Sequence, residues 1–284
     1  MTRVVFSPLA HVRLAELYPE SPGKLTHDLL DCALLTLESL VELAATLPPE
    51  SVEYNPGNLP IGIDPNDVPS PKLSPAETVR SIEENGSWMV LKRIEQRPEY
   101  GDLLHSCLAE IAPMVRKRTG AMLGSEGFIF ISSPGSVTPF HFDPEHNILL
   151  QIRGQKTMTL FPADDEELVS PLAHEAFHLG EHHRNQPWDD KFAAKGQAIT
   201  IAPGEAIHVP VKAPHWVKNG DEVSISLSIT WRSEWSYAEA DARAFNRLLR
   251  NYGLSPKTPQ RYPGRNQIKS IAARAMRKLS SAAH

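Results

Sequence analysis

The spacing of apolar residues follows a helical period in the first part of the chain. Residues 24–47 place apolar side chains three and four positions apart, which predicts one helix that ends at a proline pair. The next residues, 48–74, are rich in proline and asparagine and predict a loop across a surface. Ser74, with Glu77 three residues later, is a capping pattern and predicts a short helix that stops at Gly86.

The period becomes extended towards the middle of the chain. Residues 87–94 read as a strand and residues 98–120 as a helix, bent at Pro113. From Gly127 the chain consists of short apolar or alternating runs divided by Gly and Pro turns, the pattern of an antiparallel sandwich or barrel. Residues 235–253 return to the helical period.

The expected fold is therefore mainly β with flanking helices. The predicted parts are an N-terminal helical region with a loop (1–126), a β core (127–234) and C-terminal helices with a basic tail (235–284).

Composition restricts the class of protein. The 284 residues are 41% apolar and 22% charged, as in a globular protein, and we see no apolar run long enough to cross a bilayer. The N-terminal residues lack the uninterrupted apolar stretch of a signal peptide, so we expect a cytoplasmic protein. We interpret Cys32 and Cys107, which lie in helix-like patterns, as buried reduced thiols.

The C-terminal tail differs in charge from the rest of the chain. The net charge is −5, but residues 254–284 contribute +7 and contain no acidic residue, which leaves −12 elsewhere. Apolar residues recur in the tail at helical spacing: Ile268, Ile271, Ala272, Ala275 and Leu279. This pattern predicts an amphipathic helix that docks through its apolar face and exposes its basic face. The alternative is contact of the basic face with an acidic partner or an anionic surface.

Residues 138–147, TPFHFDPEHN, contain a candidate metal motif. Side chains alternate along a strand, so His141 and Asp143 point to one face. His215, at the end of IHVPVKAPHWV, can supply a third ligand from across the barrel. Two histidines and one carboxylate on one side of a metal suit non-haem Fe(II) chemistry with O₂. The His-x-Asp pair alone is equally consistent with a structural hydrogen bond.

Lys156 is in phase with core residues. In QKTMTLFP it falls on the same face as Met158 and Leu160, and a buried lysine is costly unless an anion pairs with it. The alternative is a lysine at a turn edge whose ammonium group reaches solvent. Thr138, just before the His-x-Asp strand, can add a hydroxyl to the same carboxylate site.

Residues 137–162 and 203–217 together resemble the cupin-like JmjC family of Fe(II)- and 2-oxoglutarate-dependent oxygenases, in particular its asparaginyl hydroxylases. The shared order is T-P-x-H-x-D, an asparagine, Q-I-x-G-x-K and L-F-P, then a Gly-acidic turn, a proline and a histidine five residues after that proline. The resemblance extends from about Gly127 to Trp231. It implies a double-stranded β-helix, the jelly-roll core of cupins.

The resemblance also assigns roles to the candidate residues. It implies that His141, Asp143 and His215 bind Fe(II), and that Thr138 and Lys156 hold the distal carboxylate of 2-oxoglutarate. Asn147 would lie near the cosubstrate or the metal. The implied activity is that of a dioxygenase, which couples oxidation of a carbon to conversion of 2-oxoglutarate into succinate. A hydroxylase acting on a peptide or protein side chain or on a small metabolite is expected, and demethylation is open.

Three positions bear on these assignments. Ala213-Pro214 precede the distal histidine where many relatives have aromatic residues. Ser228 stands where the asparaginyl hydroxylases have an asparagine, which favours the alternative of a non-catalytic metal-binding cupin module with a regulatory or binding role. His208 is a rival third ligand, but it falls where relatives carry an aromatic residue, so His215 is preferred.

Residues 171–183, PLAHEAFHLGEHH, contain a second metal motif. His174-Glu175-x-x-His178 has the spacing by which a metalloprotease helix holds zinc. A zinc peptidase needs this motif on a long buried helix, whereas here it lies in a short stretch between two prolines, so we rank this reading last. We expect a wall of the substrate entrance, with its histidines mostly on a solvated surface: His174, His178, His182 and His183.

The helix expected at residues 236–252 offers a surface for association. Four apolar residues share one of its faces: Ala238, Ala242, Phe245 and Leu249. This face could pair two subunits in a homodimer, and the alternative is packing on its own barrel.

Overall fold

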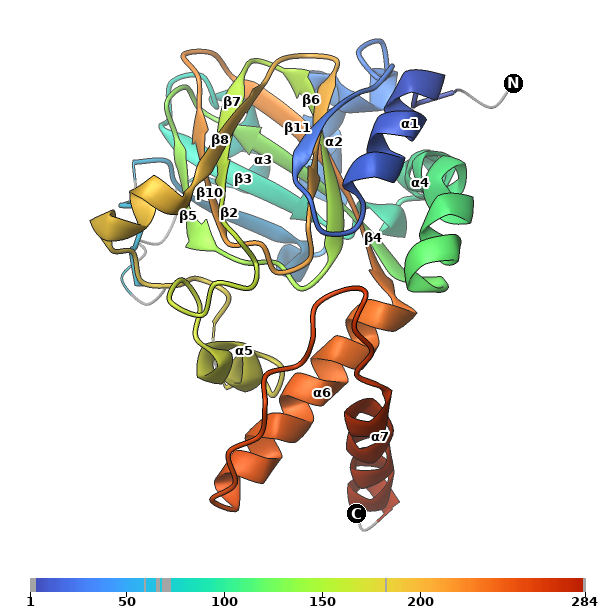
Figure 1. Cartoon of the computed structure of the whole chain (residues 1–284). Helices are drawn as coiled ribbons and strands as arrows, with labels where there is room; N and C mark the ends of the chain where they lie inside the picture. Colours follow the sequence, from blue (N-terminus) through green and yellow to red (C-terminus); the bar gives the residue numbers. More distant parts are fainter. Residues whose placement is uncertain (1–3, 59, 65–66, 68–72, 182, 283–284) are drawn as a thin grey trace.

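Two antiparallel β-sheets form the centre of the molecule (Figure 1). The computed structural model describes residues 4–58, 60–64, 67, 73–181 and 183–282. The larger sheet has the strand order β1-β9-β6-β11-β4-β3-β2. Its strands are β1 (Gly23–Thr26), β2 (Val52–Pro56), β3 (Ser87–Lys92), β4 (Met122–Ser132), β6 (His146–Arg153), β9 (Glu205–Val209) and β11 (Ser224–Ser233).

The smaller sheet closes the other side of the β core, with the strand order β5-β10-β7-β8. Its strands are β5 (Val137–His141), β7 (Lys156–Leu160), β8 (Gln197–Ile201) and β10 (His215–Asn219). Apolar side chains from both sheets meet between them, among them Leu149, Met158 and Val217. The predicted antiparallel β core is confirmed.

Helices flank this core, as expected. The α-helices are α1 (Pro8–Leu17), α2 (Leu37–Thr46), α3 (Pro75–Arg80), α4 (Pro98–Thr119), α5 (Pro171–Phe177), α6 (Glu234–Asn251) and α7 (Gln267–Ala282). Short 3-10 helices are η1 (Ala33–Leu35), η2 (Pro49–Ser51), η4 (Ile94–Gln96) and η5 (Asp190–Lys195). Figure 1 shows α1, α2 and α4 beside the larger sheet, and α6 with α7 extending away from the core.

Strand β11 alternates apolar residues on one face of the larger sheet with small polar residues on the other. Its Ile225, Leu227 and Ile229 pack into the core that the sheet shares with α1, α2 and α4. The alternate residues are small and polar, and Ser226 and Ser228 donate hydrogen bonds to Gln151 and Asn147 of the neighbouring strand β6. Small side chains on the inner face leave room inside the barrel.

Two expectations for the first part of the chain were wrong. The single helix over 24–47 is replaced by β1, η1 and α2, because residues 23–26 pair with β9 and Thr36 caps a helix that begins only at Leu37. Within the loop predicted at 48–74, residues 52–56 form β2, which pairs with β3. Local apolar spacing does not reveal these pairings, since the partner strands are distant in sequence.

Other local signals were correct. Ser74 and Glu77 form the predicted capping box of α3, and α4 contains Pro113 within its 22 residues. Strands β1, β2 and β3, all from the predicted N-terminal region, extend the larger sheet beyond the predicted core. The division at residues 126 and 234 stays a prediction.

Helix α7 forms in the basic tail, but it docks through a different face from the expected one. Ile268, Ile271 and Leu279 are 87%, 67% and 72% exposed. The helix instead packs on α6 around Asp241, whose carboxylate accepts hydrogen bonds from Ser270, Arg274 and Arg277: one hydroxyl and two guanidinium groups. A buried acidic residue on α6 therefore selects the polar face of α7. Within the described ranges, no helix has the length and apolar character needed to cross a membrane.

Candidate metal centre

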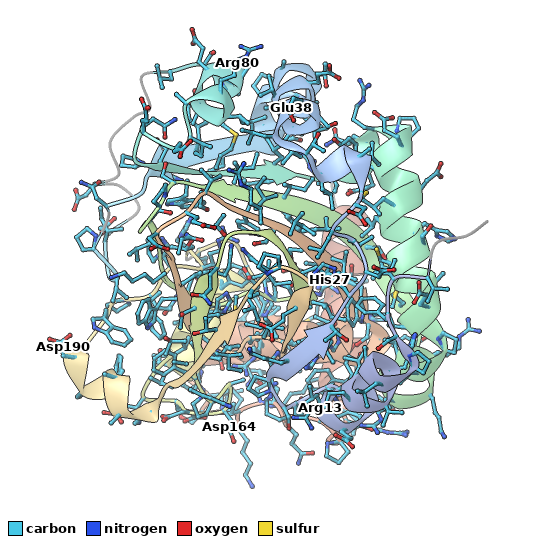
Figure 2. The ribbon with its side chains drawn as sticks, turned by 90° about the horizontal axis from the view of Figure 1, so that it is seen from above. Arg13, His27, Glu38, Arg80, Asp164 and Asp190 are labelled. Atoms are coloured by element: carbon cyan, nitrogen blue, oxygen red, sulfur yellow. The ribbon has the colours of Figure 1, made fainter. Side chains whose placement is uncertain are left out.

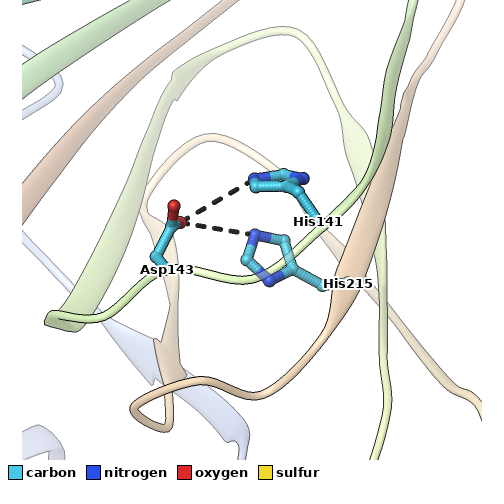
Figure 3. Close-up of side chains that lie close together, drawn as sticks. All are labelled: His141, Asp143 and His215. Carbon is cyan, nitrogen blue, oxygen red and sulfur yellow. Dashed lines mark ion pairs between the residues drawn. The ribbon is translucent and has the colours of Figure 1, made fainter. Parts of the chain in front are cut away.

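Two side chains from strands of the smaller sheet and one from a turn converge at one end of the barrel (Figure 3). His141 is the last residue of β5 and His215 the first of β10, and the two residues pair across the strands. Asp143 follows in the turn after β5. Its Oδ2 lies 3.8 Å from Nε2 of His141 and 3.7 Å from Nε2 of His215. Ligands bound at about 2.1 Å around one ion lie roughly 3 Å apart, so a small closure would complete the site.

Backbone carbonyls orient both imidazoles. Nδ1 of His141 donates to the carbonyl of Pro139 at 2.6 Å, and Nδ1 of His215 donates to the carbonyl of Ala213 at 2.9 Å. A proton on Nδ1 leaves the lone pair of Nε2 directed at the centre, as metal-binding histidines require. Burial, followed by the neighbouring His215, lowers the pKa of His141 to about 3, so the ring is neutral. The donor set fits a divalent metal.

Arg184, in the segment between α5 and β8, completes the surroundings of the carboxylate. Its Nη1 donates to Oδ1 of Asp143 at 3.1 Å, which leaves Oδ2 facing the two histidines. Burial alone would raise the pKa of Asp143, but the imidazole of His141 and the guanidinium of Arg184 beside it hold the pKa below its usual value. The carboxylate is therefore ionised and oriented before a metal arrives.

Lys156 lies inside the barrel and is only 4% exposed, so the alternative of a solvent-reaching lysine is wrong. Its Nζ lies 5.8 Å from the ring centroid of Phe130, and it has no carboxylate partner among the described residues. Burial lowers its pKa to about 7. An unpaired ammonium in such a place is costly and is relieved by a bound anion.

A pocket of about 240 Å³ opens beside the metal candidates. Thr138 and His141 line it, together with Trp88 from the inner face of β3. The indole Nε1 of Trp88 is buried and has no hydrogen-bond partner in the described part of the chain. The mouth is polar, with contributions from β2, β3 and the segment after α5: Glu53, Asn55, Lys92, His183, Arg184 and Asn185.

Asn147 and Ser228 form a buried pair in the larger sheet. The hydroxyl of Ser228 donates to Oδ1 of Asn147 at 2.8 Å, and the two residues are 1% and 6% exposed. Ser228, which stands where the asparaginyl hydroxylases have an asparagine, thus fixes the side-chain amide of Asn147, the residue predicted to lie near the cosubstrate.

His208 is excluded as the third member of the triad. Its neighbours Ile207 and Val209 face the barrel interior, whereas His208 lies on the opposite face of β9. There its Nδ1 donates to the carbonyl of Ser21 at 2.8 Å, and its ring packs against Tyr18. The preference for His215 agrees with this geometry.

The His174-Glu175-x-x-His178 motif is explained by packing. Helix α5 has only seven residues and ends before His178. Glu175 is fully buried and accepts a hydrogen bond from Nε of Arg250 on α6, while His174 packs on Phe142 with ring centroids 4.5 Å apart. Within the described ranges, the group of three or more His, Cys, Asp or Glu with metal-binding geometry is the triad above. The expectation of a solvated surface was wrong for His174, and His182 lies outside the described residues.

Sequence reasoning missed two residues of this site. Arg184 follows a variable stretch and carries no motif of its own, and Trp88 reads as an ordinary apolar member of a strand. The one available signal was the alternation of side chains along the strand. Met89 and Leu91 pack into the core on the outer face of the sheet, so Trp88 must point to the inner face.

Comparison with known proteins identifies the family. A profile of the cupin-like domain matches residues 76–237, more than half of the chain, so the protein belongs to that family. Lysine-specific demethylase 8 of Xenopus tropicalis is 30% identical over 102 residues, 34% of this chain and 23% of the relative. Human HSPB1-associated protein 1 is 28% identical over 134 residues, 44% of this chain and 28% of the relative. The chain thus spans under a third of these curated relatives.

Solved structures confirm the fold. YcfD from Escherichia coli superposes with a TM-score of 0.54 at 14% identity, over 99% of this chain and 69% of that one. A structure of YcfD, a ribosomal oxygenase, in complex with cobalt and 2-oxoglutarate matches with a TM-score of 0.52 at 14% identity, over 98% and 66% of the chains. The predicted double-stranded β-helix of cupins is therefore confirmed.

Proposed function

We propose that the protein is an Fe(II)- and 2-oxoglutarate-dependent oxygenase, with hydroxylation as its reaction. One observation carries the proposal: a carboxylate and two imidazoles converge at the barrel end, and an ammonium group without a carboxylate partner among the described residues lies buried in the same barrel. Two histidines and one carboxylate leave coordination positions open for a chelating cosubstrate and O₂. Iron in this site would supply activation of O₂ for attack on a substrate carbon.

Each residue of the candidate site has a distinct function in this proposal. His141, His215 and Asp143 hold the metal through Nε2, Nε2 and Oδ2. Lys156 neutralises the distal carboxylate of 2-oxoglutarate, and hydrogen bonds from Thr138 and Trp88 orient it. Asn147, held by Ser228, positions the cosubstrate from the larger sheet.

The pocket mouth favours a polar side chain of a protein as substrate. Glu53, Asn55 and Lys92 face it from β2 and β3, and Arg184 and Asn185 face it from the segment after α5. Charged and amide groups on both sides suit recognition of polar backbone and side-chain groups better than of an apolar metabolite. One relative is named a lysine-specific demethylase, a name that points to an amino-acid side chain as its substrate.

Succinate release tests the activity. The protein loaded with Fe(II) is incubated with 2-oxoglutarate, O₂ and peptide pools, and succinate and mass increases of the peptides are measured. We expect wild-type protein and His174→Ala to form succinate and His141→Ala to form none. No succinate and no bound 2-oxoglutarate in the wild type would refute the proposal.

A non-catalytic cupin module is the second candidate, and Ser228 in the place of an asparagine supports it. Such a module would bind metal and 2-oxoglutarate without turnover. Tight cosubstrate binding together with succinate formation in the absence of any substrate would exclude it.

We further propose that α7 pairs with a second copy of the chain. Ile268, Ile271 and Leu279 form an exposed apolar face on α7, and the core side of the helix is already packed on α6. An acidic partner has less support, because Arg274 and Arg277 are paired with Asp241. Sedimentation of the wild type and of Ile268→Asp tests the dimer. We expect the mass to fall by half in the variant, and a monomeric wild type would contradict the proposal.

We also propose a cytoplasmic location, supported by the half-buried Cys32, which forms no disulfide among the described residues. Free thiols persist in reducing compartments. Fractionation of cells would test it, and recovery in an oxidising compartment would contradict it.

A further inference from the structure

A second cavity, of about 470 Å³, lies between helices outside the two sheets. The last turn of α4, the first turn of α6 and the segment that leads into α7 surround it. Figure 1 shows the end of α4 beside the start of α6. The volume falls within the roughly 300–1,000 Å³ of pockets that hold small molecules. None of the residues assigned to the metal centre lines this cavity.

Positive charge predominates in the lining of this cavity. Arg116, Lys117 and Arg118 contribute from α4, and Arg265 contributes from the segment before α7. The one carboxylate of the lining is that of Glu234, in the first turn of α6. The lining therefore carries three more positive than negative charges, in a chain whose net charge is −5.

Most of these cations have no partner within the protein. Among the residues that the structure describes, the side chains of Arg116, Lys117 and Arg265 form no hydrogen bond or ion pair. Arg13, at the surface of the molecule in Figure 2, shows the contrasting case, since it pairs with Glu16 at 2.7 Å. Three cations that face one cavity are thus available to a ligand.

Carboxylates near the cavity do not neutralise this charge. Glu20 accepts a hydrogen bond from Nε of Arg261 at 2.9 Å. Asp241 of α6 is occupied by the hydroxyl and the two guanidinium groups of α7 described above. Glu234 forms no ion pair among the described residues, and a single carboxylate leaves the excess of positive charge in place.

The position of Arg265 is unfavourable in the absence of an anion. Helix α7 begins two residues later, at Gln267, and the N-terminal end of a helix favours negative over positive charge. The side chain of Asn266 does not compensate, because it is bonded to the backbone of Gln260. The cations of α4, by contrast, lie at its C-terminal end and offset the helix dipole. A bound anion would stabilise both Arg265 and the start of α7.

Hydrogen bonds hold the walls of the cavity in place. Nε1 of Trp235, which is 9% exposed, donates to the carbonyl of Gly264 at 2.9 Å and so fixes the backbone beside Arg265. On the opposite wall, Nη1 of Arg118 donates to the carbonyl of Tyr18. The cavity is therefore formed by contacts within the chain, and the unpaired cations project from fixed elements.

We propose that this cavity binds the diphosphate group of a small molecule, held between Arg265 on one wall and Arg116 and Lys117 on the other. A guanidinium group donates two hydrogen bonds to one phosphate, and a lysine adds a point charge. A diphosphate carries about three negative charges near neutral pH, because the second ionisation of a phosphate group lies near pH 6. This charge matches the excess of the lining. Free pyrophosphate and a nucleoside diphosphate share this chemistry.

Calorimetry with pyrophosphate and with ADP tests the proposal, on metal-free protein without 2-oxoglutarate. We expect saturable binding of one ligand per chain, and weaker binding at higher salt because the cations are exposed. Arg265→Gln and Lys117→Gln should each raise the Kd about 10- to 100-fold, the loss expected when one charged hydrogen-bond donor is removed. Glu234→Gln removes the carboxylate of the lining and should bind the ligand more tightly.

Matched variants separate this cavity from other cations. Arg80→Gln, which removes an exposed cation on α3 that Figure 2 shows at the edge of the molecule, should bind as the wild type does. Lys156→Met should also keep the binding, since it removes only the proposed 2-oxoglutarate site. Tighter binding of ADP than of pyrophosphate would assign a nucleotide, and equal binding would assign the diphosphate group alone.

Four results would each overturn the proposal. They are absence of saturable binding in both the wild type and Glu234→Gln, an unchanged Kd in Arg265→Gln, loss of binding in Lys156→Met, and equal affinity for sulfate. Because Arg265 and Lys117 are exposed, their variants should unfold at the temperature of the wild type, which thermal unfolding without ligand checks.

Discussion

Arg184 donates a hydrogen bond to Oδ1 of Asp143 at 3.1 Å and leaves the other oxygen of that carboxylate facing His141 and His215. The side chain of Arg184 is 34% exposed and lines the pocket mouth, so it connects the proposed metal ligand to the surface where substrate would enter. This contact fixes the orientation of the Asp143 carboxylate.

Replacement of Arg184 tests this positioning. In Arg184→Gln the carboxylate loses its fixed partner, and loss of such supporting contacts typically costs about 10- to 100-fold in activity or metal affinity. We expect succinate formation to fall by about that factor, with partial recovery in Arg184→Lys. Unchanged turnover in Arg184→Gln, beside an unchanged Arg153→Gln control on the exposed end of β6, would show that Asp143 needs no such support.

The variant Lys156→Met should change the affinity for 2-oxoglutarate and the stability of the fold in different ways. A hydrogen bond to a charged group contributes about 1.5–3 kcal/mol, so we expect the Kd for 2-oxoglutarate to rise about 10- to 100-fold. Removal of a buried unpaired ammonium should leave the fold as stable as the wild type or more so. Calorimetry and thermal unfolding measure the two effects, with the exposed Lys218→Met as control. A strongly destabilised variant with normal affinity would reverse our assignment.

The pKa of Lys156, about 7 because of burial, predicts a pH dependence. Between this value and the ordinary 10.5 the unfolded chain binds more protons, so the stability of the wild type rises with pH relative to Lys156→Met. Affinity for 2-oxoglutarate falls over the same range, because the neutral amine cannot pair with a carboxylate. Titration calorimetry at several pH values measures both the affinity and the proton uptake. Affinity that is constant from pH 6 to 9 would contradict the pairing.

The hydrogen bond between Ser228 and Asn147 allows a test of whether Asn147, on the larger sheet, belongs to the cosubstrate site. Ser228→Ala leaves the amide oxygen of Asn147 without its donor, at a cost of about 1 kcal/mol in stability. We expect the KM for 2-oxoglutarate to rise, because the amide loses its orientation, while metal binding is retained. Ser228→Thr keeps the hydroxyl and is the matched control. Equal KM values in both variants would remove Asn147 from the cosubstrate site.

The sequence predicted those features that depend on neighbouring residues. Alternation along TPFHFD placed His141 and Asp143 on one face, and the capping box of Ser74 and Glu77 is present. Features that depend on distant partners were missed. Pairing of β1 with β9 replaces a predicted helix, the buried Asp241 turns the apolar face of α7 outward, and Arg184 reaches Asp143 from 41 positions along the chain. No local pattern contains such information.

The central claim, that 2-oxoglutarate binds a metal held by His141, Asp143 and His215, is tested most directly by anaerobic visible absorption. Fe(II) and then 2-oxoglutarate are added to wild type, His141→Ala and His174→Ala. We predict a weak charge-transfer band in the wild type and in His174→Ala and none in His141→Ala. A band that survives in His141→Ala, or its absence from all three proteins, would contradict the assignment.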